Sequence, residues 1–266
     1  MSRIQSKFLE LKKKKEKALI AYYMVGYPSY KDTISVIRGL IKGGADIIEL
    51  GFPFSDPLAD GPVIQNASTI SLERGTKLNH LFGLVSKIRK ESEIPLVLMT
   101  YTNILYHQGY DRFFAMAKKA GIDGFIVPDM TVEESKEYIS AAKRYNIDTI
   151  FLVSPNTAKS RLEKLIKQTT GFLYLVSVFG TTGMRSKIQS YTIDALKNTK
   201  KAARSKIPVG IGFGISTPRD ISNYVRHGAD AAIVGSALIK LVECTAPNRL
   251  EKTVAEFTKK LKDATK

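Results

Sequence analysis

The chain has 266 residues, of which 44% are hydrophobic and 25% charged, and its formal net charge is +16. This length allows one large α/β domain or two small ones, and the composition is that of an ordinary globular protein. No apolar run approaches the roughly 20 residues that cross a bilayer, the N-terminus lacks the apolar core of a secretion signal, and the single Cys244 excludes an internal disulfide. We therefore expect a cytoplasmic protein without a membrane span.

The positive charge raises the alternative of a polyanion-binding protein, because a basic surface attracts phosphate backbones. The lysines are spread over the whole chain and concentrate only near its ends, at Lys12–Lys15 and in the C-terminal KKLKDATK. Helix-turn-helix, zinc-finger and RNA-recognition signatures are absent from the sequence. We expect solvated helix faces and no nucleic-acid partner; a weak attraction for anionic metabolites is the alternative.

Apolar runs rich in β-branched residues alternate with amphipathic segments along the chain. Eight runs predict strands, at Leu19–Met24, Asp46–Leu50, Leu96–Tyr101, Gly124–Pro128, Thr149–Val153, Phe172–Val176, Val209–Gly212 and Ala231–Val234. Eight segments with apolar residues three and four apart predict helices, at Tyr30–Lys42, Leu78–Glu91, Asp111–Ala120, Val132–Tyr145, Ser160–Gln168, Ile193–Ala203, Thr217–His227 and Leu250–Lys262. Short strands that alternate with helices favour parallel pairing through crossover connections.

This alternation predicts an α/β fold, a closed (β/α)8 TIM barrel that spans residues 1–266 as a single domain. An extra N-terminal helix around Ser6–Lys15 is expected to cover the bottom of the barrel. Three glycine-containing segments support the barrel prediction, because each predicts a helix that ends just before a strand. They are GGAD, AGID and HGAD (Gly43–Asp46, Ala120–Asp123 and His227–Asp230).

Two strand-to-helix connections are longer than a barrel requires. They are Gly51–Lys77, in which a short helix is expected near Gln65–Arg74, and Ser177–Thr192. Long loops inside compact domains are usually functional, and barrel enzymes place their active sites on this side of the sheet. These two loops are the first candidates for chemistry.

Three glycine-bearing segments follow the last three predicted strands. They are FGTTGMRS (Phe179–Ser186), GFGIS (Gly212–Ser216) and VGSAL (Val234–Leu238), and a short helix is expected after VGS. Glycines let a backbone approach an anion closely, and the N–H groups at a helix start favour negative charge. The loops predict a phosphate site at the place where barrels commonly hold one, although glycines that only form turns are an alternative.

Acids stand in an apolar setting in the segment IELGFPFSDPLADG, which starts at Ile48 and includes Glu49, Asp56 and Asp60. If Glu49 faces the barrel mouth, the apolar surroundings raise its pKa towards neutrality, which suits a group that both gives and takes a proton. Asp60 could swing over the same cavity. A structural ion pair for Glu49 and a helix cap for Asp60 are the alternatives.

A metal site is not expected, because the residues near these acids include no histidine or cysteine ligand. His80, His107 and His227 all lie in or beside predicted helices and are expected at the surface.

A set of sequence segments occurs along the chain, namely IELGFPFSDPLADGPVIQNAS, VPDMTVEES, SVFGTTGMRS, GFGIS and VGSALIK. In these segments, and in their order and spacing, the chain resembles the alpha chain of tryptophan synthase. The resemblance runs from about Tyr22 to Ala264, and the GFPFSDPLADGP block is its most specific part.

The resemblance implies a lyase that cleaves indole-3-glycerol phosphate to indole and D-glyceraldehyde 3-phosphate in a retro-aldol step, with no metal or organic cofactor in this chain. It also implies a beta chain as partner, in an α2β2 heterotetramer. The beta chain uses pyridoxal phosphate to join the indole to serine, and the indole reaches it through an internal tunnel.

Residue roles follow from the same resemblance. Glu49 matches the group that shuttles protons between the substrate hydroxyl and carbon 3 of the indole, and Asp60 matches the group that binds the indole N–H. The other matches are phosphate contacts at Gly183, Gly214, Gly235 and Ser236, an indole pocket of Tyr22, Met99, Tyr101, Ile126 and Phe213, a contact of Tyr174 with the glutamate, and loop closure by Thr182 beside Asp60. Core packing is the alternative for the indole-pocket residues.

Asp56 matches a contact to the beta chain rather than a catalyst, together with Pro57 and Asn103. The chain departs from the family pattern at Met24, Ile104, Thr131 and Phe179, which leaves the pocket shape and the partner interface less defined. Three alternatives remain open at this point: a stand-alone lyase with the same site, an alpha chain that mainly activates its partner, and a different phosphate-binding barrel isomerase.

Overall fold

The computed structural model describes residues 1–176, 190–204, 206–212 and 214–266. Within them, nine parallel strands form one sheet in the order β5-β4-β3-β2-β1-β9-β8-β7-β6. The strands are β1 (Ala18–Met24), β2 (Ile47–Gly51), β3 (Leu96–Met99), β4 (Gly124–Ile126), β5 (Asp148–Ile150), β6 (Leu152–Val153), β7 (Leu173–Val176), β8 (Val209–Gly212) and β9 (Ala231–Val234). The two ends of this order, β5 and β6, are consecutive in the chain, so the sheet curls into a nearly closed barrel. The predicted TIM barrel is confirmed.

The prediction of eight strands was wrong at one place, because the fifth strand is split. Phe151 separates β5, which pairs with β4, from β6, which pairs with β7. The carbonyl of Phe151 accepts a hydrogen bond of 3.0 Å from the N–H of Tyr174, so the chain changes partners at this residue. The apolar run Ile150–Val153 continues unbroken through Phe151, which is why the sequence gives no sign of the interruption.

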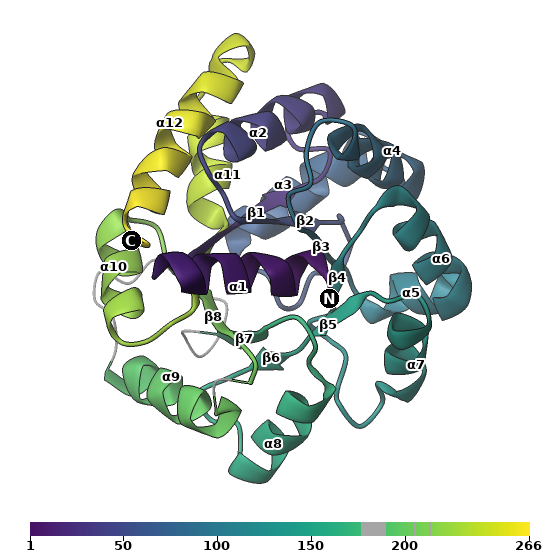
Figure 1. Cartoon of the computed structure of the whole chain (residues 1–266). Coiled ribbons are helices and arrows are strands. Elements are labelled where there is room, and N and C mark those ends of the chain that lie inside the picture. Colours follow the sequence, from purple (N-terminus) through teal and green to yellow (C-terminus); the bar gives the residue numbers. More distant parts are fainter. Residues whose placement is uncertain (177–189, 205, 213) are drawn as a thin grey trace.

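Helices surround the barrel, as Figure 1 shows. They are α1 (Arg3–Lys14), α2 (Tyr30–Lys42), α3 (Pro62–Glu73), α4 (Leu78–Arg89), α5 (Thr102–Gln108), α6 (Tyr110–Ala120), α7 (Lys136–Arg144), α8 (Lys159–Gln168), α9 (Ser190–Ala203), α10 (Pro218–Arg226), α11 (Ser236–Glu243), the 3-10 turn η1 (Pro247–Arg249) and α12 (Leu250–Asp263). None of the helices described here is long and apolar enough to cross a membrane.

All eight predicted helices are present; α2 has the predicted bounds, and the other seven differ by one to four residues at one or both ends. The short helix expected near Gln65–Arg74 begins earlier, because Pro62 takes the first helical position, where its missing N–H costs nothing. The N-terminal helix also begins earlier than predicted, because Ser2 and Gln5 form a capping box at its start. The sequence analysis missed α5 and η1, which are too short to show a periodic pattern.

The GGAD, AGID and HGAD segments end α2, α6 and α10, as predicted. Their aspartates have a further role that the sequence did not indicate. Each carboxylate accepts a hydrogen bond of 2.8 or 2.9 Å from the N–H of the first or second residue of a neighbouring strand, in the pairs Asp46–Leu19, Asp123–Leu96 and Asp230–Val209. The three motifs therefore fix neighbouring strands to one another at the bottom of the barrel.

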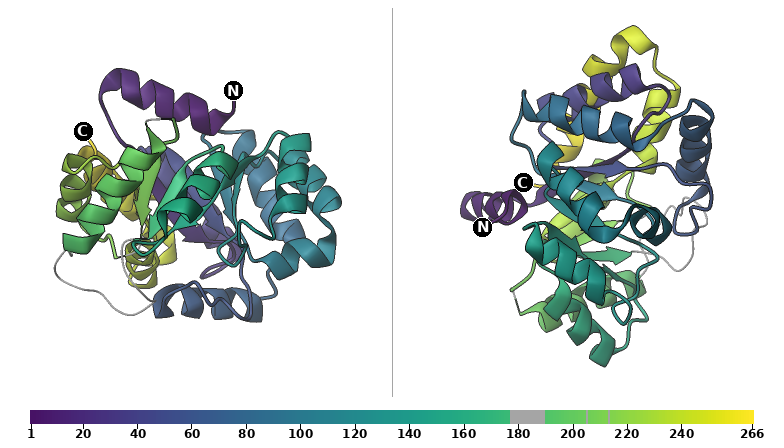
Figure 2. Two further views of the ribbon diagram at one scale, coloured as in Figure 1. Left: turned by 90° about the horizontal axis from the view of Figure 1, so that it is seen from below. Right: turned by 90° about the vertical axis from the view of Figure 1, so that its right-hand side faces the viewer.

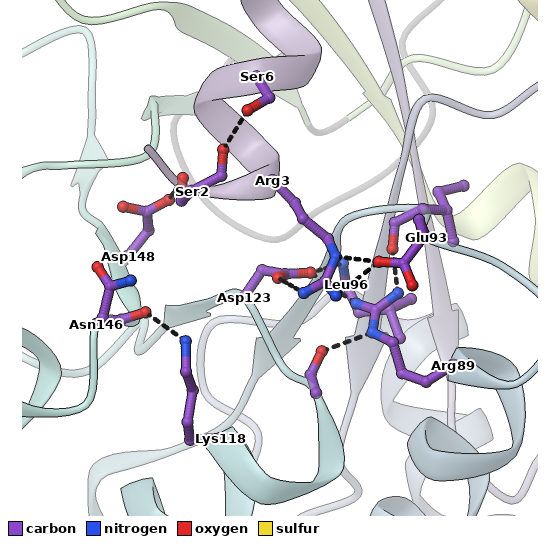
Figure 3. Close-up of polar contacts among 12 residues, drawn as sticks. Ser2, Arg3, Ser6, Arg89, Glu93, Leu96, Lys118, Asp123, Asn146 and Asp148 are labelled. Atoms are coloured by element: carbon purple, nitrogen blue, oxygen red, sulfur yellow. Dashed lines mark hydrogen bonds and ion pairs between the residues drawn. The ribbon is translucent and has the colours of Figure 1, made fainter.

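Helix α1 closes this end of the barrel, and in Figure 2 (left) it lies opposite the end where α3 is found. Ile4 and Leu11 of α1 are buried in the core. Figure 3 shows the polar contacts that hold the helix: Ser2 Oγ donates to Asp148, and Arg3 reaches Asp123 at 3.0 Å. The predicted cover is thus present, and it leaves the opposite end open for a ligand.

Candidate active site

A cavity of about 650 Å³ lies at the carboxyl ends of the strands. Nine of the residues singled out by the sequence line it: Tyr22, Glu49, Asp60, Met99, Ile126, Tyr174, Gly214, Gly235 and Ser236. They come from five strands and from three of the connections that follow strands, so only the closed barrel brings them together. Parallel strands end on one side of a sheet, and this explains why residues so far apart in sequence share one cavity.

Glu49 lies in β2 and faces this cavity, which resolves the orientation that the sequence left open. Its side chain is 1% exposed, and burial, together with the negative charge of Asp60, raises its pKa to about 8. Its Oε2 accepts no hydrogen bond from the residues that the structure describes, and none of their cations forms an ion pair with it. A structural ion pair is therefore not what holds this carboxyl group, which is mainly protonated at neutral pH.

Asp60 lies in the connection between β2 and α3 and is 2% exposed. Burial raises its pKa to about 6, while a hydrogen bond of 2.9 Å from the hydroxyl of Tyr101 to its Oδ2 opposes this rise. Asp60 does not cap α3, because Gly61 occupies the cap position without a side-chain bond. The cavity therefore holds two buried carboxyl groups with different proton affinities.

The loop that carries Asp60 is held from two sides. From α3, Gln65 Nε2 donates to the carbonyl of Asp60 at 2.9 Å, and Ser68 bonds both the N–H and the carbonyl of Phe54 at 2.9 Å. From the next connection, the ring of Tyr101 stacks on Phe54, with centroids 5.0 Å apart. These contacts fix Asp60 over the cavity rather than leaving it to swing.

Two tyrosines extend into the cavity from β1 and β7, and each occupies space that a neighbouring glycine leaves open. A Cβ on Gly51 would lie 2.2 Å from the hydroxyl oxygen of Tyr22, and a Cβ on Gly212 would lie 2.3 Å from that of Tyr174. Glycine inside a strand often marks such a close approach. Burial and the charges of both carboxylates raise the pKa of each tyrosine well above its usual value, so both are neutral phenols.

Two of the three predicted phosphate loops, those that carry Gly214 and Gly235, line the cavity, and the third, Phe179–Ser186, lies outside the described residues. Gly214 has φ +74, a conformation that favours glycine, and a Cβ there would meet no described atom within 4 Å. Gly235 precedes α11 and Ser236 is its first residue, so N–H groups at the start of this helix are directed at the cavity. The geometry can accept an anion at this place.

Some of the predicted site residues do not line the observed cavity. Tyr101 is not among the described residues that line it, and its hydroxyl instead serves Asp60. Thr182, Gly183, Phe213 and the departure at Phe179 lie outside the residues that the structure describes. The loop that was expected to end at Thr192 is shorter, because α9 begins at Ser190.

The three residues assigned to a partner interface lie on the connections after β2 and β3, and none of them lines the cavity. Asp56 and Asn103 are exposed and Pro57 is half-buried. Their neighbour Leu58 is 83% exposed, and Tyr106 of α5 is 74% exposed. Large apolar side chains on these connections are compatible with a covering partner.

Sequence reasoning missed the outer part of the cavity. Val63 and Ile64 of α3, Leu241 of α11 and Phe257 of α12 line it there, with Lys240 one helical turn beyond Ser236. Residues four apart on a helix share a face, so the spacing of Ser236 and Lys240 was a usable signal. Within the described part of the chain, no group of three or more His, Cys, Asp or Glu side chains is arranged to hold a metal ion.

Comparison with known proteins agrees with this geometry. The family model described as tryptophan synthase alpha chain matches residues 8–266. The chain belongs to the tryptophan synthase alpha chain family.

Similarity to individual family members extends over nearly the whole chain. The tryptophan synthase alpha chain of Methanosarcina acetivorans is 46% identical over 241 residues, which cover 91% of this chain and 86% of that one. The alpha chain of Carboxydothermus hydrogenoformans is 45% identical over 252 residues, covering 95% and 93%. In the structure of the tryptophan synthase α2β2 complex of Pyrococcus furiosus, one chain superposes with a TM-score of 0.86 at 38% identity, covering 92% of this chain and 98% of that one.

Proposed function

We propose that this chain cleaves indole-3-glycerol phosphate to indole and D-glyceraldehyde 3-phosphate, as the alpha subunit of a tryptophan synthase. The observation that carries the proposal is the pair Glu49 and Asp60, two buried carboxyl groups on one cavity with pKa values of about 8 and about 6. Different proton affinities assign different tasks to two carboxyl groups in one site.

Asp60 binds the indole nitrogen. With a pKa of about 6 it is mainly ionised at neutral pH, and its carboxylate accepts a hydrogen bond from the indole N–H. When carbon 3 of the ring takes up a proton, positive charge develops on this nitrogen. A carboxylate already in place stabilises that charge without reorganisation.

Glu49 moves the proton. With a pKa of about 8 it holds a proton at neutral pH and delivers it to carbon 3 of the indole. The resulting carboxylate then takes the proton from the hydroxyl on the adjoining carbon, the carbon–carbon bond breaks, and its electron pair restores the aromatic ring. The products are indole and an aldehyde, and Glu49 regains its proton, so the cycle balances.

The phosphate of the substrate binds at Gly214, Gly235 and Ser236, and Gly183 is proposed to join them from outside the described residues. The apolar part of the cavity, which includes Met99 and Ile126, receives the indole ring. Binding at both ends holds the reacting carbon beside Glu49, and such positioning supplies a large part of the rate enhancement.

We further propose a beta chain as partner, in an α2β2 complex like the one in the solved structure from Pyrococcus furiosus. Asp56, Pro57 and Asn103 contact it. Since Asp56 and Asp60 share one loop, contact with a partner can alter the position of Asp60 directly. Indole released in the cavity passes to the beta chain, where pyridoxal phosphate supplies the chemistry of the next step; the reaction of this chain needs no cofactor.

The experiment that tests the proposal adds indole-3-glycerol phosphate to the purified chain and follows indole release, with and without a tryptophan synthase beta chain. We expect slow release from the isolated chain and a large increase in the complex. Full turnover without the beta chain would instead favour a stand-alone lyase, and activation of the beta chain with almost no indole release would favour an activating subunit. No indole in either case would contradict the assignment.

A further inference from the structure

Tyr22 carries a hydroxyl group that the mechanism above does not use. The residue lies in β1 and is 4% exposed. On one side it pairs in register with Glu49 of β2. On the other side Ala21 pairs with Val234 of β9, so Tyr22 lies beside the next residue, Gly235. The Tyr22 side chain therefore lies between the proposed phosphate site and the proton-transfer group.

The orientation of the ring is fixed by two glycines. A Cβ on Gly235 would lie 3.1 Å from Cδ1 and 3.3 Å from Cβ of Tyr22, so the near end of the side chain packs on the phosphate loop. A Cβ on Gly51 would lie 2.2 Å from the hydroxyl oxygen, so the far end reaches the end of β2, two residues beyond Glu49. The ring thus bridges the two parts of the site that bind the two ends of the substrate.

No hydrogen bond joins the hydroxyl of Tyr22 to the described residues, and the hydroxyl is not among the fully enclosed atoms without a partner, which is consistent with its being open to the cavity that the residue lines. Buried tyrosine hydroxyls usually find a partner. The neighbouring hydroxyl of Tyr23, on the other face of the same strand, follows this rule and donates to the carbonyl of Tyr27 at 2.9 Å. Because burial and two nearby carboxylates keep Tyr22 a neutral phenol, its hydroxyl can donate a hydrogen bond to a ligand.

The substrate offers one group at this position. Its three-carbon chain runs from the phosphate to the indole and carries two hydroxyls, of which Glu49 takes the one that reacts. The hydroxyl on the middle carbon lies between the phosphate site and Glu49, where the Tyr22 ring lies. This placement rests on the proposed function, because it uses that substrate's binding direction.

We propose that the Tyr22 hydroxyl binds the middle, non-reacting hydroxyl of the substrate's glycerol phosphate chain and so makes the site specific for a hydroxylated chain. When a substrate lacks the hydroxyl that a buried polar group of the site would bind, that polar group is left without a partner. This penalty is the basis of strong discrimination between substrates with and without the hydroxyl.

The test compares the wild type with Tyr22→Phe on two substrates, indole-3-glycerol phosphate and its analogue without the middle hydroxyl. We expect the wild type to prefer the natural substrate by roughly tenfold or more in kcat/KM, the usual size of one hydrogen bond to a substrate. Tyr22→Phe should lose about that factor on the natural substrate and show almost no preference. Indole-3-propanol phosphate, which carries neither hydroxyl, should bind both proteins equally.

Two further variants strengthen the test. Tyr23→Phe removes a hydroxyl from the same strand on the face away from the cavity, and it should keep the wild-type preference. Gly51→Ala introduces a methyl group where the Tyr22 hydroxyl lies, so it should reduce the preference while leaving that hydroxyl in the protein.

A Tyr22→Phe variant that keeps the wild-type preference would overturn the inference, and so would one that loses the same factor on both substrates, because the hydroxyl would then act on the carboxylates. These outcomes differ from failure of the proposed function. That failure would appear as no indole release from the wild type itself, and it would remove both proposals.

Discussion

The hydroxyl of Tyr101 donates a hydrogen bond of 2.9 Å to Oδ2 of Asp60, although the two residues are 41 positions apart. The hydroxyl oxygen of Tyr101 also accepts a hydrogen bond of 3.3 Å from the N–H of Ala59, so Tyr101 holds both the side chain of Asp60 and the backbone of its loop. A hydrogen bond to the ionised form of a carboxyl group lowers its pKa. Tyr101 therefore keeps Asp60 more acidic than burial alone would allow.

Tyr101→Phe should move the acid limb of the pH profile. We expect kcat/KM for the wild type to be bell-shaped, falling below pH 6 as Asp60 is protonated and above pH 8 as Glu49 loses its proton. Without the hydroxyl, the pKa of Asp60 rises, so the acid limb should move up by about one pH unit. Measurement of indole release from pH 5 to 9 checks this.

The control for that measurement is Tyr106→Phe on α5, which removes a hydroxyl from a side chain that is 74% exposed. It should leave both limbs in place. An acid limb that stays at the wild-type pH in Tyr101→Phe would contradict the role given to this hydrogen bond.

Glu49→Gln and Asp60→Asn should lose most of the cleavage activity while the protein stays folded. Each well-placed proton transfer contributes about 10²–10⁴ in rate, and neither amide can replace the carboxyl group. Indole release at pH 7 measures the loss, and circular dichroism checks the fold. Wild-type turnover in either variant would exclude the role assigned to that residue.

Glu49→Gln should also change how stability depends on pH. Folding raises the pKa of Glu49 from 4.5 to about 8, so the folded state binds this proton more tightly than the unfolded state does. The contribution of Glu49 to the free energy of unfolding is therefore fully present below about pH 4.5 and is lost as the pH rises to about 8. We expect Glu49→Gln to be more stable than the wild type at pH 9 by about 5 kcal/mol, since the rise from 4.5 to about 8 is about 3.5 pKa units of about 1.4 kcal/mol each.

Urea unfolding of both proteins at pH 5 and pH 9 measures this difference. Groups that do not interact with Glu49 titrate equally in the two proteins, so subtraction isolates Glu49 together with its coupling to Asp60. A difference between the proteins that is the same at both pH values would mean that folding does not raise the pKa of Glu49.

Asp56→Ala should act on the complex rather than on the isolated chain. Asp56 is exposed, and its carboxylate accepts a hydrogen bond from the adjacent Ser55 hydroxyl rather than facing the cavity. We expect indole release by the isolated variant within about twofold of the wild type and a much smaller increase on adding the beta chain. Glu256→Ala, an exposed acid on α12, is the matched control. Equal losses with and without the partner would contradict the interface role.

Asp123→Asn should destabilise the bottom of the barrel without changing the chemistry. Asp123 pairs at 2.6 Å with Arg89, whose side chain is 11% exposed, so the variant leaves a nearly buried cation without its counter-charge. Breaking such a pair costs about 3 kcal/mol in the free energy of unfolding. Glu93→Gln removes an acid that is 76% exposed and should cost less than about 1 kcal/mol. Similar stability of the two variants would count against the proposed role of Asp123.

Local sequence signals were enough for much of the barrel. Buried strands, amphipathic helices and the glycines before Asp46, Asp123 and Asp230 each depend on neighbours a few residues away, so their pattern could be interpreted directly. The split at Phe151 and the short helix α5 could not be predicted, because hydrogen bonds to distant strands and packing of a single loop decide them.

The sequence by itself determined the fold class and the family, and it identified Glu49 and Asp60 as the candidate catalytic acids. The order of strands and helices and the GFPFSDPLADGP block are local features of the chain, which is why they could be recognised directly. The tertiary structure decided which way Glu49 faces, that Tyr101 serves Asp60, and that the Tyr22 hydroxyl fits against Gly51. These relationships depend on distances between residues on different strands. Closure of the barrel sets those distances, and with them the burial that separates the proton affinities of Glu49 and Asp60.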